Sequence, residues 1–142
     1  MTFKEISAWI ETAAIVALYG YYIVEVPHAA TAGAAFGLYV GVAVAFIALV
    51  VVLNIAAAIM HRPENEDERD RLIAAKASRN AYFVLMTGTF GAILLLLVPD
   101  ASLSQFTHLP QSMMAVHLLV LSIAAGELLR FTSQVLYYRL GA

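Results

Sequence analysis

Six polar side chains interrupt the apolar stretches of this sequence and are the first candidates for chemistry: Glu11, Asn54, Asn80, Glu127, Arg130 and Gln134. Charged groups surrounded by lipid or apolar side chains are costly unless they are paired or hydrated. Glu127, Arg130 and Gln134 are spaced so that they share one face of a helix. We therefore expect a polar network in which Arg130 lies between the carboxylates of Glu11 and Glu127. The alternative is that Glu127 and Arg130 simply face headgroups and water near a helix end.

A second set contains donor atoms for metal ions: Glu25, His28, Asp100, His108 and His117, with Met113 and Met114 nearby. Imidazole, carboxylate and thioether groups together suit copper or zinc. Glu25 and His28 are three residues apart, as ligands on one helical turn would be, although Pro27 interrupts that turn. His117 reaches His28 only if their helices are neighbours, and one haem between these histidines is a further alternative. The competing interpretation, without any cofactor, is a set of separate loop histidines plus one hydrogen-bonded helix histidine.

Other catalytic chemistry finds little support in the sequence. The chain has no cysteine, which excludes disulfides, thiolate metal sites and cysteine nucleophiles. HExxH, P-loop and glycine-rich dinucleotide motifs are absent, and no serine, histidine and carboxylate can be placed together. An enzyme is therefore the least favoured functional class. The net charge of −2 argues against a nucleic-acid-binding surface.

The elements that must position these side chains are four long apolar runs, at Ile6–Val26, Ala34–Met60, Asn80–Val98 and Ser112–Arg130. The 142 residues are 62% hydrophobic and 13% charged, with a mean hydropathy of +0.82. A helix needs about 20 apolar residues to cross a bilayer, so four crossings take up most of the chain. The run 40–58 is apolar on every side and does not alternate, which favours helices over strands. The predicted fold is an all-α, integral membrane four-helix bundle that forms a single domain over residues 1–142.

The basic residues give this bundle an orientation. All eight lysines and arginines fall on one side of the membrane when the four runs are laid out as spans, because the links 27–33 and 99–111 contain none. Cytoplasmic flanks hold the excess of positive charge in membrane proteins. We therefore expect both termini and the 61–79 loop to lie in the cytoplasm, at a bacterial inner membrane. The first run resembles a cleavable secretory signal, but Glu5, Glu11 and Glu25 interrupt that pattern, so we expect it to be retained.

The loop between the second and third runs is the main hydrophilic stretch. Asn65 followed by Glu68 predicts an N-cap with a capping-box partner, so a helix should begin near Glu66 and continue into the third span. We expect the charged residues of this segment to bind a partner: Asp67, Glu68, Arg69, Asp70, Arg71, Lys76 and Arg79. The alternative is a solvated turn that only caps the third helix. The fourth helix should overrun Arg130 into an aromatic and basic tail.

Small residues recur every four positions at the start of the second run: Gly33, Gly37, Gly41 and Ala45. Residues four apart share a helix face, and glycine lets another backbone approach closely in lipid. Two interpretations remain open: the stripe packs against another helix of the same bundle, or it forms the seam of a homodimer. Gly88 and Gly91 in the third run are expected to serve helix packing in the same way.

Two segments carry a resemblance to a known family. Residues 67–79 read D-E-R-D-R-x-I-x-x-K-x-x-R, and residues 127–139 begin E-L-L-R and end Y-Y-R. They resemble the central loop and the C-terminal pattern of an uncharacterised family of small four-span bacterial inner-membrane proteins. Genes of that family often neighbour a small helix-turn-helix regulator, which implies a sensing or sequestering role. The first two spans match the family only in hydrophobicity, and the histidines are not part of its pattern.

These features predict a non-enzymatic regulatory or interaction protein. It would bind a cytoplasmic protein, such as a helix-turn-helix regulator, through its loop helix and C-terminal tail. Two alternatives stay open. Glu11 and the glycine stripe are similar to features of small multidrug transporters, which favours a proton-coupled transporter that works as an oligomer. The other is an accessory subunit, or a metal- or haem-binding protein, of a larger membrane complex.

Overall fold

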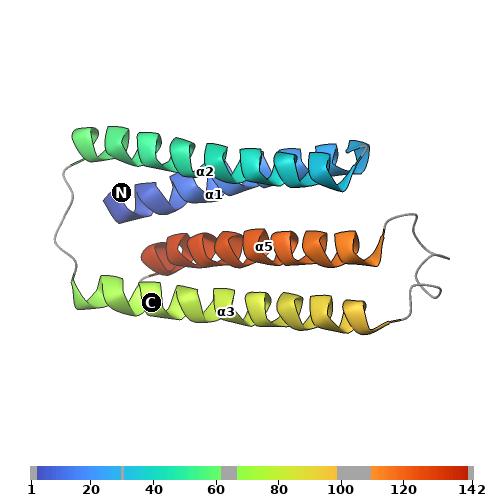
Figure 1. The fold of residues 1–142 in the computed structure, drawn as a ribbon. Coiled ribbons are helices and arrows are strands. Elements are labelled where there is room, and N and C mark those ends of the chain that lie inside the picture. Colours follow the sequence, from blue (N-terminus) through green and yellow to red (C-terminus); the bar gives the residue numbers. More distant parts are fainter. Residues whose placement is uncertain (1–2, 30, 62–66, 99–109, 141–142) are drawn as a thin grey trace.

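The computed structural model describes residues 3–29, 31–61, 67–98 and 110–140 (Figure 1). Four long helices make up nearly all of this part: α1 (Phe3–Glu25), α2 (Ala32–Met60), α3 (Glu68–Leu97) and α5 (Gln111–Leu140). A short 3₁₀ turn, η1 (Val26–His28), continues α1 across Pro27. All four helices are long and apolar enough to cross a membrane. No strand occurs in the described ranges, so the predicted all-helical membrane fold is confirmed.

Polar side chains close the helix ends at the links. The Thr31 hydroxyl oxygen accepts a hydrogen bond from the Ala34 N–H at 3.1 Å, which caps the start of α2. At the other link, the Gln111 side-chain amide donates to the backbone carbonyls of Leu95 and Val98. Leu95 lies in the last turn of α3, where its carbonyl also accepts from the Val98 N–H at 3.3 Å, and Val98 is the C-cap residue of the helix. The first residue of α5 therefore completes the end of α3.

The predicted cap of α3 is wrong by two residues. Asp67 is the N-cap and Asp70 its capping-box partner, whereas Asn65 and Glu66 lie outside the described residues. Asp67 Oδ1 accepts from the Asp70 N–H at 2.7 Å, and Asp70 Oδ2 accepts from the Asp67 N–H at 3.3 Å. The pair Asn65 and Glu68 has the same three-residue spacing, so the sequence offers two registers. Contacts from other helices to Asp70 select the second one.

Consecutive helices run antiparallel, and they form a row of two pairs (Figure 1). α2 packs chiefly on α1, α3 packs on α5, and the contact between α1 and α5 joins the two pairs. The starts of α1 and α3 therefore lie beside the ends of α2 and α5; we call this the charged end of the row. The other end, where η1, the start of α2 and the start of α5 lie, is the opposite end.

Small residues let α3 and α5 approach closely along their whole length. They recur at intervals of four and seven on both helices, at Ala77, Ala81, Gly88 and Ala92 of α3 and at Ala115, Ser122, Gly126 and Ser133 of α5. A Cβ atom added at Gly88 would overlap the Ser122 side chain, and one added at Gly126 would lie 3.0 Å from Leu85 Cγ. Gly88 thus packs as predicted. Gly91 is in ordinary contact distance of Leu118. In lipid, such small-residue seams provide the van der Waals contact that holds helices together.

The glycine stripe of α2 does not pack inside the chain. Gly33, Gly37, Gly41 and Ala45 are all exposed. A Cβ atom added at Gly37 or Gly41 would meet nothing within 4 Å, and one at Gly33 would meet only Thr31 of its own cap. The interpretation of packing within the bundle is therefore wrong, because α2 lies at the edge of the row and turns this face away from α1. The homodimer seam stays a prediction.

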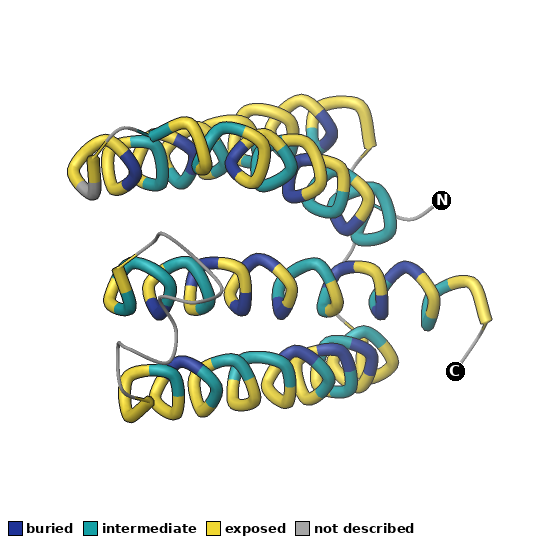
Figure 2. Tube along the Cα trace, turned by 90° about the vertical axis from the view of Figure 1, so that its right-hand side faces the viewer, coloured by how far each residue is buried: buried dark blue, intermediate teal, exposed yellow. Residues whose placement is uncertain are grey.

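Large apolar side chains are exposed along the outer helices, for example Val44 and Ile47 on α2 and Phe83 and Phe90 on α3. Figure 2 shows buried residues as isolated turns along helices that are otherwise intermediate or exposed. A water-soluble chain would bury such side chains, whereas a lipid environment accepts them. The exposure is therefore that of a membrane-embedded helix array.

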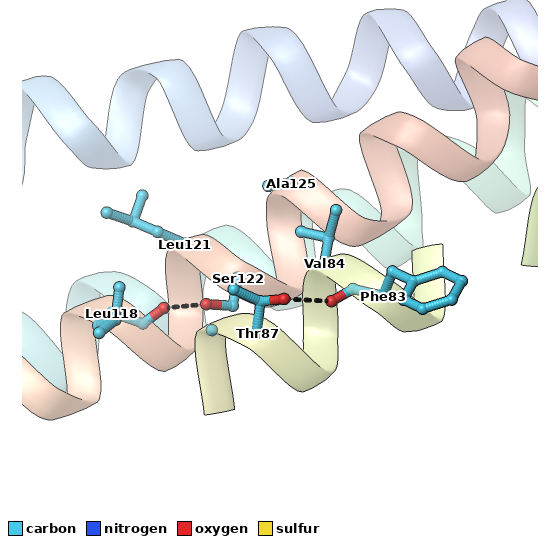
Figure 3. A pocket seen from close by; sticks show the side chains of 8 residues that line it. Phe83, Val84, Thr87, Leu118, Leu121, Ser122 and Ala125 are labelled. Atoms are coloured by element: carbon cyan, nitrogen blue, oxygen red, sulfur yellow. Dashed lines mark hydrogen bonds between the residues drawn. The ribbon is translucent and has the colours of Figure 1, made fainter. Parts of the chain in front are cut away.

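A groove of about 420 Å³ runs between α3 and α5. Figure 3 shows Thr87 and Ser122 side by side in it, with each hydroxyl turned back to a carbonyl of its own helix, Phe83 O at 2.8 Å and Leu118 O at 2.6 Å. The hydroxyl hydrogens are used in these bonds, and the other lining residues are apolar. This groove resembles a lipid-facing surface and offers little chemistry.

Candidate functional site

Asp70, on the first turn of α3, ties three helices together at the charged end. The Lys4 ammonium group of α1 donates to Asp70 Oδ2 at 2.7 Å, and the Tyr138 hydroxyl of α5 donates to Asp70 Oδ1 at 3.0 Å. The Asp70 side chain is only 18% exposed. Hydrogen bonds in which one partner is charged are shorter and stronger than neutral ones. This single carboxylate therefore fixes the start of α3 against both α1 and α5.

A second contact between α1 and α5 involves Arg139, near the end of α5. Its Nε donates to Glu5 Oε1 at 3.1 Å, and its guanidinium group lies 5.5 Å from the centre of the Trp9 ring. The Arg139 side chain is 57% exposed while that of Glu5 is 12% exposed. An arginine over an indole face gains a modest cation–π attraction. The tail of α5 is thereby held against the first two turns of α1.

The predicted docking segment and the predicted C-terminal tail lie side by side. Besides the bond between Asp70 and Tyr138, Arg69 donates to the Tyr138 carbonyl at 3.5 Å. About two and three turns further along α3, Lys76 lies 5.8 Å from the centre of the Tyr137 ring, and Asn80 Nδ2 donates to the Tyr137 hydroxyl at 3.1 Å. We call the combined area of residues 67–80 and 133–140 the composite surface. Its hydrogen bonds join residues that lie between 53 and 69 positions apart in the chain.

The seven predicted docking residues divide by their roles. Asp67 caps the helix, Asp70 and Lys76 contact neighbouring helices, and both of the latter are only partly exposed. The side chains that remain exposed on the composite surface are those of Asp67, Glu68, Arg69, Arg71 and Arg79. Two of the seven expected charges, Asp70 and Lys76, therefore contact neighbouring helices, and the other five are exposed.

A polar pocket of about 210 Å³ lies beneath these contacts, between α1, α3 and α5. Glu11, Arg130 and Gln134 of the predicted network line it, together with Lys4, Ser7, Asp70 and Tyr138. The Ser7 hydroxyl donates to Glu11 Oε1 at 3.4 Å. Three helices thus bring two carboxylates and two cations to one cavity, which we call the polar pocket.

The rest of the predicted six-residue network does not converge. Arg130 pairs with Glu127 at 3.0 Å, but no ion pair joins Arg130 to Glu11 among the described residues, so Arg130 does not bridge two carboxylates. Arg130 Nε is buried without a hydrogen-bond partner in the described part of the chain. Asn54 donates to Val50 O on its own helix, and α2 packs chiefly on α1. Asn80 donates to Ser133 Oγ at 3.3 Å and so belongs to the α3–α5 contact.

The opposite end holds one buried polar pair. The Tyr22 hydroxyl of α1 and His117 Nδ1 of α5 are 2.7 Å apart, and the two rings meet edge to face with centres 6.0 Å apart. The Tyr22 side chain is 1% exposed. Beside this pair is a cavity of about 230 Å³ between α1, α2 and α5, which we call the histidine pocket. Its walls are otherwise mainly apolar.

The predicted metal ligands are not gathered around this pocket. His28 is exposed and its Nδ1 is 3.0 Å from the Val24 carbonyl of its own helix, whereas His117 contacts Tyr22. His28 and His117 therefore make separate contacts although α1 and α5 are neighbours. Within residues 3–29, 31–61, 67–98 and 110–140, no three histidine or carboxylate side chains, Glu25 included, come together as a metal site. His108 and Asp100 lie outside the described residues.

The family assignment rests on nearly the whole chain. A family model described as "Predicted membrane protein (DUF2178)" matches residues 7–141. The chain belongs to this family. The match includes the composite surface, the histidine pocket and the polar pocket apart from Phe3 and Lys4. Neither the curated proteins nor the solved structures contain a match to the chain.

Sequence reasoning missed the two tyrosines on which this DUF2178 structure depends most. Tyr138 falls within the aromatic tail that the sequence predicts, whereas no sequence feature singles out Tyr22 in the first span. The available signal was weak: buried tyrosine hydroxyls need a partner, and Asp70 and His117 lie at comparable depths in other helices. Which helices are neighbours decides the pairing, and the sequence does not give that order.

Proposed function

We propose that this protein is a non-enzymatic membrane protein that binds a cytoplasmic protein through the composite surface. The observation that carries the proposal is the hydrogen bond between Tyr138 and Asp70, which joins the start of α3 to the end of α5. A fixed surface loses less conformational entropy on binding than two separate segments would. The exposed charges on it can then select a partner.

The charge pattern supports an inner-membrane location with this surface in the cytoplasm. The basic residues of the described chain lie at or near the charged end: Lys4, Arg69, Arg71, Lys76, Arg79, Arg130 and Arg139. Positive flanks of this kind stay on the cytoplasmic side during insertion. Both termini would then be cytoplasmic, and a soluble protein would reach the composite surface directly.

The mixture of signs favours a protein partner. Acidic and basic side chains alternate at the start of α3, from Asp67 to Arg71, and a surface of mixed sign gives no strong attraction to anionic lipid or nucleic acid. Complementary charges mainly confer partner specificity and association rate. The family resemblance implies a small helix-turn-helix regulator, and such a protein is the first partner to test.

The test is a charge-neutral triple variant, Asp67→Ser, Glu68→Gln and Arg69→Gln. Serine keeps the N-cap, so α3 should still begin at the same residue. We expect a purified small helix-turn-helix regulator, of the kind that the family resemblance implies, to bind the nanodisc-embedded wild type and to bind this variant about tenfold more weakly, because three exposed charges are lost. The matched control is Glu25→Gln with His28→Gln at the opposite end.

The two variants separate the outcomes of this experiment. Weaker binding by the triple variant with unchanged binding by the control supports docking at the composite surface. Equal binding by both variants contradicts docking at this surface. Absence of binding by the wild type contradicts it as well. Thermal unfolding of each variant shows whether the helix array is intact.

A second candidate function is proton-coupled transport, and the observation that favours it is Glu11 in the polar pocket. A carboxylate in a membrane-embedded pocket can exchange a proton for a cationic substrate. Substrate uptake into proteoliposomes driven by a pH gradient, and abolished by Glu11→Gln but not by Glu25→Gln, would support transport. Absence of gradient-driven uptake would leave protein binding as the function.

A further inference from the structure

The size of the histidine pocket suits one ring. Its volume is about 230 Å³, whereas an engineered apolar cavity of about 150 Å³ holds a benzene molecule. The pocket therefore has room for a single six-membered ring with small substituents. A peptide segment or a haem is too large for it.

The lining indicates an uncharged occupant. No lysine, arginine, aspartate or glutamate is among the described residues that line it, and the apolar ones are Ala35, Phe36, Pro110, Met113 and Val116. A charged group moved into such surroundings without a charged partner loses much of its solvation energy. A neutral molecule does not incur this cost.

One hydrogen-bonding position in the pocket is held in place by a buried partner. His117 lines the pocket, and its Nδ1 is bonded to the Tyr22 hydroxyl at 2.7 Å. A neutral imidazole has one donor and one acceptor nitrogen, so Nε2 is the ring nitrogen that remains for another molecule. When Tyr22 donates to Nδ1, Nε2 carries the hydrogen and donates to an acceptor oxygen. Tyr39 and Ser112, whose side chains carry hydroxyl groups, also line the pocket.

Aromatic rings surround the same space. The centre of the Tyr22 ring lies 6.3 Å from that of Tyr39 and 6.0 Å from that of His117, both in edge-to-face geometry. Phe36 lines the pocket as well and is 65% exposed. Aromatic side chains attract other rings in stacked or edge-on arrangements. The walls thus favour a planar ring over a flexible acyl chain.

We propose that the histidine pocket binds a neutral, single-ring molecule that carries an oxygen atom, such as a benzoquinone or a phenol, with that oxygen bonded to His117. This site is at the opposite end from the composite surface and is independent of the function proposed above. The ring has two potential sources. It is the head of a lipid-tailed quinone that enters from the bilayer, or a tail-free compound that enters from the water.

The first experiment compares probes on the full-length protein in lipid nanodiscs. Tetramethylbenzoquinone should shift the NMR signal of the labelled His117 ring and saturate, while the signal of His28 stays in place. Tetramethylbenzene has nearly the same shape but no oxygen, so it should bind about fivefold to tenfold more weakly, the effect of one hydrogen bond. Equal affinity for the two probes, or no saturable shift with either, overturns the proposal.

A decyl-substituted benzoquinone separates the two sources. Tighter binding than tetramethylbenzoquinone, at equal concentration in the bilayer, assigns the site to a tailed lipid. Weaker binding assigns it to a compound from the water. Both results are consistent with the same ring chemistry at His117.

The second experiment uses variants at the two described histidines of this end. His117→Leu removes the hydrogen bond to the ligand and keeps an apolar wall, so tetramethylbenzoquinone should bind about fivefold to tenfold more weakly, measured by the ligand-induced rise in unfolding temperature. His28→Leu is the matched control, since His28 is exposed and contacts its own helix, and should bind as the wild type does. Should His117→Leu destabilise the fold, Tyr22→Phe is the second variant. It removes the hydrogen bond that orients the His117 ring and keeps the aromatic ring of residue 22, and tetramethylbenzoquinone should again bind more weakly. Equal binding by wild type and both pocket variants contradicts the proposal.

Discussion

The two ends of the helix array hold their polar side chains in opposite ways. At the charged end, Asp70 and Arg139 connect α1, α3 and α5 through ionic hydrogen bonds between partly exposed groups. At the opposite end, one neutral pair, Tyr22 and His117, lies among apolar residues, and Tyr22 is fully buried. The first arrangement suits a surface in contact with water, and the second suits a pocket inside the membrane.

The difference concerns how each end responds to its surroundings. Exposed ion pairs are weakened by salt, because mobile ions screen them, whereas a buried neutral hydrogen bond is not. Conversely, a buried hydrogen-bonding group that loses its partner lowers stability more than an exposed group does, because water cannot replace the partner. The charged end therefore has several ionic contacts between helices, two of which share Asp70, whereas Tyr22 and His117 form one neutral, buried contact at the opposite end.

The largest expected effect is at Asp70. Asp70→Ala removes the ion pair with Lys4, the hydrogen bond from Tyr138 and the return bond of the capping box. We expect the free energy of unfolding in detergent to fall by about 2 to 3 kcal/mol, with part of this difference lost at high salt. The control is Glu68→Ala. Glu68 lies two residues before Asp70 and is exposed, so this variant should change stability by less than about 0.5 kcal/mol. Similar losses in both variants would mean that the three-helix contact does not stabilise the fold.

An intermediate effect is expected at the opposite end. Tyr22→Phe removes the hydroxyl that bonds to His117 and keeps the ring in place. The expected loss is about 1 kcal/mol, the net value of one buried neutral hydrogen bond, and it should not depend on salt. Thermal unfolding of this variant at low and high salt measures the loss, and Tyr39→Phe is the control. A salt-dependent loss would remove the contrast between the two ends.

The smallest effect on stability is expected at Arg139. Arg139→Gln removes an ion pair with Glu5 in which the arginine is mostly exposed, so stability should change by less than about 0.5 kcal/mol. The same substitution removes a cation from the face of Trp9, which is the only tryptophan in the sequence. Its fluorescence emission should therefore change in intensity or wavelength. An unchanged Trp9 spectrum would argue that the tail of α5 does not contact α1 in solution.

The four helices could be predicted because span length depends only on composition. Each apolar run is close to or longer than the about 20 residues that a bilayer crossing requires. The sequence places most helix ends within a turn or so, and it also predicts that α3 and α5 extend beyond their apolar runs. The start of α3 was placed two residues early because Asn65 with Glu68 and Asp67 with Asp70 have equal spacing. Only the contacts of Asp70 with Lys4 and Tyr138 distinguish the two registers.

The pairing of helices could not be predicted, and most of the site depends on it. The regular four-residue stripe of α2 predicts helix packing at Gly37 and Gly41, but these glycines face away from the rest of the chain. The tight contact between α3 and α5 instead uses Gly88 and Ser122, where small residues are less regularly spaced. Likewise, Glu11, Arg130 and Gln134 line one pocket because α1 and α5 are neighbours. Asn54 is excluded from it because α2 is at the edge of the row.

The most direct test of the central claim is the side of the membrane on which each end lies. Because the chain has no cysteine, single variants Glu68→Cys, Leu140→Cys and Thr31→Cys give unambiguous labelling with a membrane-impermeant maleimide. In intact cells we predict that only Thr31→Cys is labelled, and that the other two react only after the membrane is opened. Labelling of Glu68→Cys in intact cells, or of Glu68→Cys and Leu140→Cys from different sides, would contradict the account.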